Sequence, residues 1–170
     1  DYWLMDVKPA LEKLKDNAEF KTWQQKNNTY FSYALKIPQE MDTNSWQLGF
    51  YDKKKDKITT FILTGNQVEI RPEEEIFKKE TTKVAGIELK KVNLSFDEAL
   101  SAAAAFQTKS FPKDNSIKTI AILQNMPKMG NIWNITFVTE TFNILNMKID
   151  ASSGKIIEHS IQSIFSFRKQ

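Results

Sequence analysis

The sequence predicts an α+β protein built from two tandem modules, each with one helix packed on a four-stranded antiparallel sheet. A segment with helical spacing is followed by four short strand-like segments, and this order occurs twice along the 170 residues. The connections between successive strand-like segments are short, which predicts antiparallel meanders rather than parallel crossovers.

The first module opens with a helix predicted over Asp6–Lys26. Asp6 is a suitable N-cap, Pro9 fits the first turn, and apolar residues then recur at helical spacing. Alternating apolar residues predict four strands after it. These strands are Tyr30–Ile37, Trp46–Tyr51, Ile58–Thr64 and Gln67–Arg71. Gly65 marks the turn between the last two, since glycine readily adopts the positive φ of tight turns.

The second module opens at Ser95, which has capping-box spacing to Glu98. Its helix is predicted to run through an alanine-rich stretch and to end near Pro112. The four strands that follow are predicted at Ser116–Gln124, Ile132–Thr139, Thr141–Ile149 and Lys155–Ile161. The motifs Trp46-x-Leu48-x-Phe50 and Trp133-x-Ile135-x-Phe137 occupy equivalent places, which supports a duplicated plan.

Residues 73–93 form a predicted connector between modules that span residues 1–72 and 94–170. The connector begins with Glu73-Glu74-Glu75 and then carries apolar residues among its charges. Because so apolar a segment is seldom a solvated tether, we expect it to pack against both modules.

Composition excludes several classes of protein. The formal net charge is +3, with basic and acidic residues interleaved, so the sequence gives no support for nucleic-acid binding. Cysteine is absent, which excludes disulfides, thiolate nucleophiles and cysteine-ligated metals. No apolar run approaches the ~18–20 residues of a transmembrane helix. The start at Asp1 leads us to expect a trimmed or mature N-terminus and leaves open whether an anchor precedes it.

The chain shows no catalytic, cofactor-binding or metal-binding residues, and we predict that it is not an enzyme. His159 is the only histidine, and a lone histidine on a strand is more often structural than catalytic. The acidic run at Glu73–Glu75 favours a solvated surface. The glycines fall in no phosphate-binding spacing.

A turn after Asp150 is the clearest local feature. An aspartate before such a turn can accept hydrogen bonds from the following backbone N–H groups. We therefore predict structural-turn roles for Asp150, Ser152 and Gly154, as for Gly65. Calcium ligation by Asp150 with Ser152 is the alternative, although the further acids of a calcium loop are missing.

Two surface segments are predicted partner contacts. Lys53, Lys54 and Lys55 lie in a predicted hairpin turn, where weak contact with nucleic acid or an anionic membrane is the alternative to simple solvation. The tail carries the apolar residues Ile164, Phe165 and Phe167. It either extends the last strand or forms an apolar edge suited to a partner.

Residues Phe142–Ile157, FNILNMKIDASSGKII, resemble the C-terminal signature of PepSY domains, in which an Ile-Asp-Ala run leads to Ser/Thr-Gly-Lys and an apolar strand. The resemblance covers Leu94–Ser160. Two such modules would be similar to YpmB-like tandem proteins, although the first half, at Gly65, lacks the Asp-Ala pair. The resemblance implies cystatin-like modules, an extracytoplasmic location, no catalysis and a role in regulating peptidases.

We therefore expect a non-enzymatic, extracytoplasmic binding or regulatory domain, membrane-anchored or secreted. Its partner would be a protein such as a peptidase, or another cell-envelope component, with membrane contact only through a segment outside this sequence. One alternative is a small-molecule or lipid-binding module with a pocket between helix and sheet. A solid core lined by Trp46, Phe50, Trp133 and Phe137 would argue against such a pocket. A hydrolase using Asp150 or Glu73–Glu75 is the remaining alternative.

Overall fold

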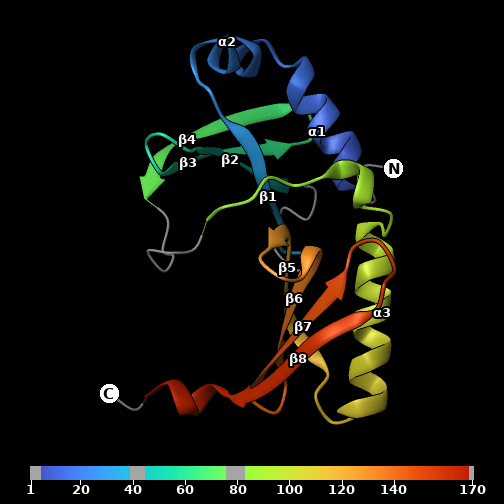
Figure 1. The fold of residues 1–170 in the computed structure, drawn as a ribbon. Helices are drawn as coiled ribbons and strands as arrows, with labels where there is room; N and C mark the ends of the chain where they lie inside the picture. Colours follow the sequence, from blue (N-terminus) through green and yellow to red (C-terminus); the bar gives the residue numbers. More distant parts are fainter. Residues whose placement is uncertain (1–4, 39–44, 76–82, 169–170) are drawn as a thin grey trace.

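A computed structural model describes residues 5–38, 45–75 and 83–168, and its strands form one eight-stranded antiparallel sheet (Figure 1). The α-helices of that part of the chain are α1 (Val7–Asp16), α2 (Ala18–Lys26) and α3 (Phe96–Ser110). The first four strands are β1 (Tyr30–Lys36), β2 (Ser45–Asp52), β3 (Lys57–Thr64) and β4 (Gln67–Glu75). The other four are β5 (Ser116–Met126), β6 (Gly130–Thr139), β7 (Asn143–Asp150) and β8 (Ile156–Ser163). Two short 3-10 helices are η2 (Leu89–Lys91) and η3 (Ile164–Arg168).

The predicted fold class is wrong about the sheet. Two separate four-stranded sheets were expected, but the strand order β4-β3-β2-β1-β5-β6-β7-β8 is continuous. The two meanders join where Tyr33–Lys36 of β1 pairs antiparallel with Ala121–Gln124 of β5. Two separate sheets would have left β1 and β5 as apolar edges, and their pairing satisfies both. The two cystatin-like modules are therefore not present as separate units.

The first predicted helix is interrupted at Asn17. The backbone there is extended, with φ −73° and ψ 133°, so α1 ends and α2 begins anew. The Asn17 side chain accepts a hydrogen bond from the Phe20 N–H at 3.0 Å and caps α2. A side chain that can satisfy a free helix N–H competes with continuation of the helix.

A continuous core lies between the helices and one face of the sheet. Alternation along β2 and β6 directs both tryptophan motifs to this face, where their apolar side chains are at most 4% exposed. The Trp46 and Trp133 rings are 6.4 Å apart and lie on the two sides of the β1–β5 pair. Each indole N–H donates to a carbonyl next to a helix start, Trp46 to Met5 at 2.9 Å and Trp133 to Leu94 at 3.0 Å. The two halves therefore share one core.

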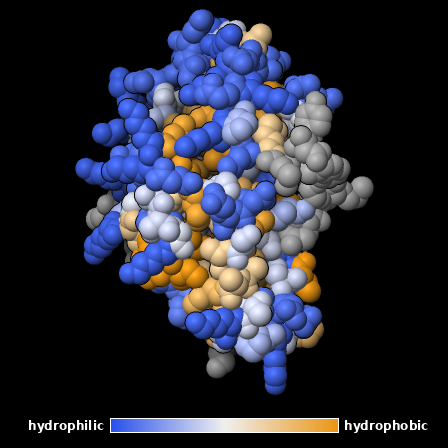
Figure 2. Space-filling model, turned by 90° about the vertical axis from the view of Figure 1, so that its right-hand side faces the viewer, coloured by the Kyte–Doolittle hydropathy of each residue, from blue (hydrophilic) through white to orange (hydrophobic). Residues whose placement is uncertain are grey.

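The helix side of the molecule is shown in Figure 2. Hydrophilic side chains cover most of its upper part, and pale orange surface gathers in the lower part, where α3 runs. Ala104 and Ala105 of α3 are exposed. The buried residues of α3 are Phe96, Ala99, Ala103 and Gln107.

The end of the connector crosses the junction of the two halves. The Ile87 N–H donates to the Phe31 carbonyl at 2.9 Å, and the Tyr30 hydroxyl donates to the Val84 carbonyl at 2.6 Å. On the other side, the Asn125 amide donates to the Gly86 carbonyl at 2.9 Å. Residues 84–87 thus fill the space where β1 and β5 separate.

Candidate functional site

The described part of the chain contains no group of three or more His, Cys, Asp and Glu side chains able to hold a metal ion. His159 lies exposed on β8, and its ring packs against Phe106 at 4.9 Å and Phe111 at 6.0 Å between centroids. The rings of Phe106 and Phe111 therefore flank this histidine.

The turn after β7 is held together by Asp150. Its carboxylate accepts from the Ser153 hydroxyl at 2.6 Å and from the Ser153 N–H at 3.1 Å. The Ser153 hydroxyl is the main cause that lowers the pKa of Asp150, while burial opposes it. Gly154 has φ +79°, and an added Cβ would lie 3.3 Å from Leu94. The Asn93 amide reaches the Ser152 hydroxyl at 3.1 Å, so the turn also supports the segment before α3.

The other predicted turn residues lie at the far half of the sheet. Gly65 has φ +59° in the β3–β4 turn, and its carbonyl accepts from the Lys13 ammonium at 3.4 Å. Lys53, Lys54 and Lys55 are exposed in the β2–β3 turn, as predicted from the charge run. The Asp52 carboxylate accepts from the Lys54 and Lys55 N–H groups, each at 3.0 Å, so this loop is structured by its own acid.

Charge at the β2–β3 turn is largely balanced. The Lys55 ammonium is 3.0 Å from the Glu73 carboxylate on β4. Asp52 adds a second acid at the base of the turn. These three lysines therefore form no isolated basic surface.

The predicted apolar tail lies in η3, next to a residue that the sequence analysis did not single out. Phe165 is 51% exposed and its ring lies 5.9 Å from that of Phe142, which is 58% exposed. Ile164 is half-buried, and its N–H donates to the Phe142 carbonyl at 2.8 Å. The Phe167 side chain lies outside the described residues. Phe142 was placed inside a predicted strand, but it occupies the β6–β7 turn.

That turn is anchored by Asp114, which is 8% exposed. Its carboxylate accepts hydrogen bonds from the Thr139 hydroxyl at 3.0 Å, the Asn143 amide at 2.9 Å and the Thr141 hydroxyl. The Thr141 hydroxyl is the largest cause that lowers the pKa of Asp114, and burial acts in the opposite direction. A sequence reading could not connect Asp114 with residues 25–29 positions away.

The two edges of the sheet differ in chemistry. The β4 edge reads QVEIRPEEE and contains five charged residues and a proline. The β8 edge reads IIEHSIQS, with Glu158 as its single acidic or basic residue apart from His159. Glu158, Ser160 and Gln162 are all exposed. The Glu158 carboxylate lies 3.9 Å from the Lys148 ammonium on the sheet face away from the helices.

Comparison with known proteins identifies the fold but not a family. No protein-family model matches the sequence, and no curated protein matches it either. A solved structure with a similar fold is that of a putative lipoprotein from Clostridium difficile 630, with a TM-score of 0.61 and 12% identity over 94% of both chains. Among the helices described here, none combines the length and apolar character needed to cross a membrane. The two chains therefore share an architecture over nearly their whole length, and an identity this low shows the fold alone.

Proposed function

We propose that this protein is a non-enzymatic binding domain that acts outside the cytoplasm and captures an extended segment of a protein partner along β8. The observation that carries the proposal is the difference between the two sheet edges. An edge strand presents unpaired backbone N–H and C=O groups, and natural proteins usually protect such edges with charges or proline. β4 has both kinds of protection. β8 has a single carboxylate over eight residues.

The surroundings of β8 favour a peptide with alternating character. On the helix side, a strand paired with β8 would lie next to His159 and the half-buried rings of Phe106 and Phe111. On the opposite face it would meet Glu158 and the exposed Ser160 and Gln162. Strand addition takes affinity from backbone hydrogen bonds and specificity from alternate side chains. The segment that fits has apolar residues toward α3 and polar residues on the other face.

Peptidases are the first partners to test, and the cell envelope is the compartment in which we expect the protein. The resemblance of Leu94–Ser160 to PepSY domains implies that the protein partner is a peptidase. The similar solved structure is described as a putative lipoprotein, which supports an extracytoplasmic protein that is membrane-anchored or secreted.

The test compares two edges of the same sheet. Purified protein would be titrated with secreted peptidases and with labelled peptides that alternate apolar and polar residues, using fluorescence anisotropy. Ser160→Lys combined with Gln162→Lys should weaken binding by at least tenfold, because lysines on an edge oppose strand addition. Gln67→Lys on β4 is the matched control and should leave binding unchanged. Hydrogen exchange should show new protection in β8 when the partner is present.

Any of three results would contradict the proposal. Binding that survives the double lysine variant would place the partner elsewhere. Absence of binding to every peptidase and peptide would refute partner capture along β8. A cytoplasmic location of the protein in cell fractionation would refute the proposed location.

The alternative of a small-molecule or lipid pocket between helix and sheet has less support. The residues expected to line either a pocket or a solid core are Trp46, Phe50, Trp133 and Phe137. The side chain of each is at most 4% exposed. Phe50 packs on Phe20 at 5.1 Å and on Phe61 at 5.8 Å. Side chains that fill this space leave little room for a ligand. A co-purified ligand in a native mass spectrum would favour the pocket over the strand edge.

A further inference from the structure

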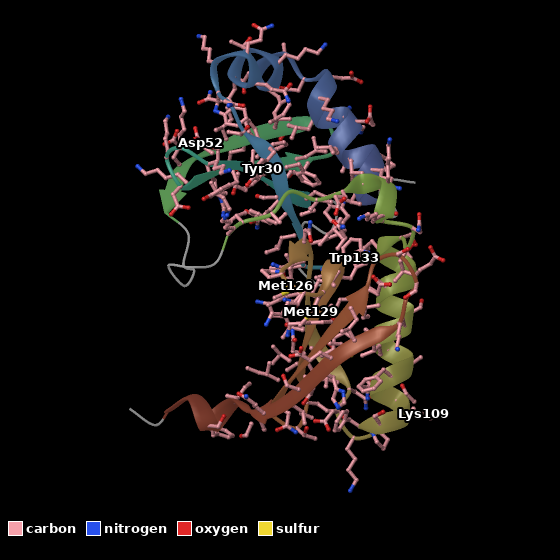
Figure 3. The ribbon with its side chains drawn as sticks, viewed as in Figure 1. Tyr30, Asp52, Lys109, Met126, Met129 and Trp133 are labelled. Carbon is pink, nitrogen blue, oxygen red and sulfur yellow. The ribbon has the colours of Figure 1, made fainter. Side chains whose placement is uncertain are left out.

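We propose that one end of the molecule docks directly on an anionic lipid surface. This aromatic–basic end comprises Lys109, Lys113, Ile117, Lys118, Phe142 and Phe165. They come from the α3 C-terminus, the α3–β5 connection, the start of β5, the β6–β7 turn and η3. Figures 1 and 3 show these segments, with Lys109 labelled, at the lower end of the view. The sequence predicts membrane contact only through a segment outside it, so this contact would be an additional one.

Exposed apolar side chains concentrate at this end. Ile117, Phe142 and Phe165 are 59%, 58% and 51% exposed, and they are three of the five large hydrophobic residues that the described surface exposes most. Phe142 and Phe165 form a ring pair. Ile117 lies in the irregular step of the β5–β6 ladder between Ser116 and Lys118, beside the strand end that leads to Phe142. Large apolar side chains that gather on one exposed surface usually mark an interaction site.

The backbone at Phe142 indicates that this exposure is not incidental. Phe142 has φ +63°, a left-handed conformation that a bulky residue rarely adopts and that asparagine or glycine adopts more easily. The Asp114 hydrogen bonds to Thr141 and Asn143 fix the residues on either side of it. The turn therefore holds an aromatic ring toward solvent at a cost in stability.

The charges at this end complement an anionic bilayer. Lys109, Lys113 and Lys118 are exposed, and along the chain they lie on either side of Ile117. Two carboxylates lie near these lysines: Asp114 is buried among three neutral donors, and the exposed Glu140 accepts from the Asn115 amide at 3.0 Å. Both keep their negative charge, so the three lysines outnumber the nearby carboxylates by three to two. Basic residues near an anionic leaflet strengthen binding by about fivefold each, and apolar side chains add to this by entering the interface.

This inference does not rest on the proposed β8 function, and its experiment gives a separate result. The whole protein would be sedimented with vesicles of phosphatidylcholine alone or mixed with phosphatidylglycerol. We expect binding to the mixed vesicles and much weaker binding to the neutral ones. Lys109→Gln combined with Lys113→Gln should reduce binding to the mixed vesicles by about 25-fold, from fivefold for each charge.

The aromatic variants provide the sharper comparison. Phe142→Asn should reduce vesicle binding several-fold while raising the melting temperature, because asparagine tolerates the left-handed backbone. Phe165→Ser should reduce binding without a rise in melting temperature. Ile70→Ser is the matched control, since Ile70 is 41% exposed on β4 at the other end of the sheet. Its vesicle binding should equal that of the unchanged protein.

Three outcomes would overturn the proposal. One is an absence of binding to the mixed vesicles. Another is an equal loss of binding in Ile70→Ser, which would indicate general hydrophobic adsorption. The third is a loss of peptidase binding in the aromatic variants with vesicle binding unchanged, which would assign this end to a protein partner.

Discussion

Replacing Asp6 tests whether the two halves of the sheet fold as one unit. One oxygen of the Asp6 carboxylate accepts from the Val7 N–H at 2.8 Å, at the start of α1. The same oxygen accepts from the Phe96 N–H at 3.1 Å, at the start of α3. Asp6 is therefore bonded to a residue 90 positions away in the sequence, and one oxygen serves the starts of both helices. Asp6→Ala removes both bonds with a single substitution.

The expected cost exceeds that of an ordinary helix cap. Loss of the α1 cap should destabilise the protein by about 1 kcal/mol. The Phe96 N–H, on a residue only 6% exposed, would lose its partner, which costs about 1–3 kcal/mol. The sum predicts a loss of about 2–4 kcal/mol. Asp6→Asn keeps an oxygen acceptor and loses mainly the charge next to two helix N-termini, so it should cost less than about 2 kcal/mol.

Urea denaturation followed by tryptophan fluorescence gives the free energies of unfolding. Ser95→Ala is the reference variant, because Ser95 caps α3 alone, accepting from the Glu98 N–H at 3.1 Å. We expect Asp6→Ala to cost more than Ser95→Ala and to lower hydrogen-exchange protection in both halves of the sheet together. A smaller cost for Asp6→Ala, or separate unfolding of β1–β4 and β5–β8, would refute the shared core as the basis of stability.

Two further predictions concern packing and pH. At Gly49 an added Cβ would lie 1.9 Å from the Tyr33 ring, so Gly49→Ala should destabilise the protein by about 1–3 kcal/mol. Gly86→Ala, whose Cβ would make an ordinary 3.5 Å contact with Tyr30, should change the melting temperature little. A similar loss in both would contradict the steric reason. Asp114 has a folded pKa below its ordinary value, so its contribution to stability is present above the unfolded pKa and is lost as pH falls through the lowered one. Melting temperatures measured from pH 5 downward should therefore fall less steeply in Asp114→Asn than in the unchanged protein, and equal slopes would show that other carboxylates dominate acid unfolding.

Six of the strands, β1–β3 and β5–β7, were predictable because alternate residues of each face the buried core. All eight predicted strands match observed ones, with ends that differ by a few residues. Alternation is a reliable signal when one face is covered and the other meets solvent. The same reasoning placed Trp46 and Trp133 correctly on the covered face.

The helix break and the Phe142 turn were missed for local reasons. Asn17 lies between Leu14 and Ala18, whose spacing continues the apolar stripe of a single helix. The only sign of a new helix start was an asparagine three residues before Phe20, the spacing of an N-cap and the N–H that it accepts from. Phe142 looked like a strand residue because aromatic residues favour strands. It has a left-handed backbone and lies between Thr141 and Asn143, both of which bond Asp114 from a distant part of the chain.

The joining of the two sheets left a trace in the sequence that could have been used. The β1 residues Tyr33 and Leu35, on the face away from the helices, and Ile122 of β5 are all half-buried. Strands apolar on both faces usually lie at the centre of a sheet, and charged strands at its edge. β1 and β5 each contain one charged residue and β4 contains five, so the charge part of this rule favours β4 as an edge, as observed.

The same rule applies to β8, whose low charge suits a strand with neighbours on both sides, although the described part of the chain pairs it only with β7. Solvent alone does not favour leaving such an edge unprotected, since it invites pairing with other chains. A paired partner strand would give β8 the environment that its composition matches. The double lysine variant at Ser160 and Gln162 tests this reasoning. If it were as soluble and bound the partner as well as the unchanged protein, the low charge of β8 would have no bearing on binding. The charge difference between β4 and β8 would then not identify a binding edge.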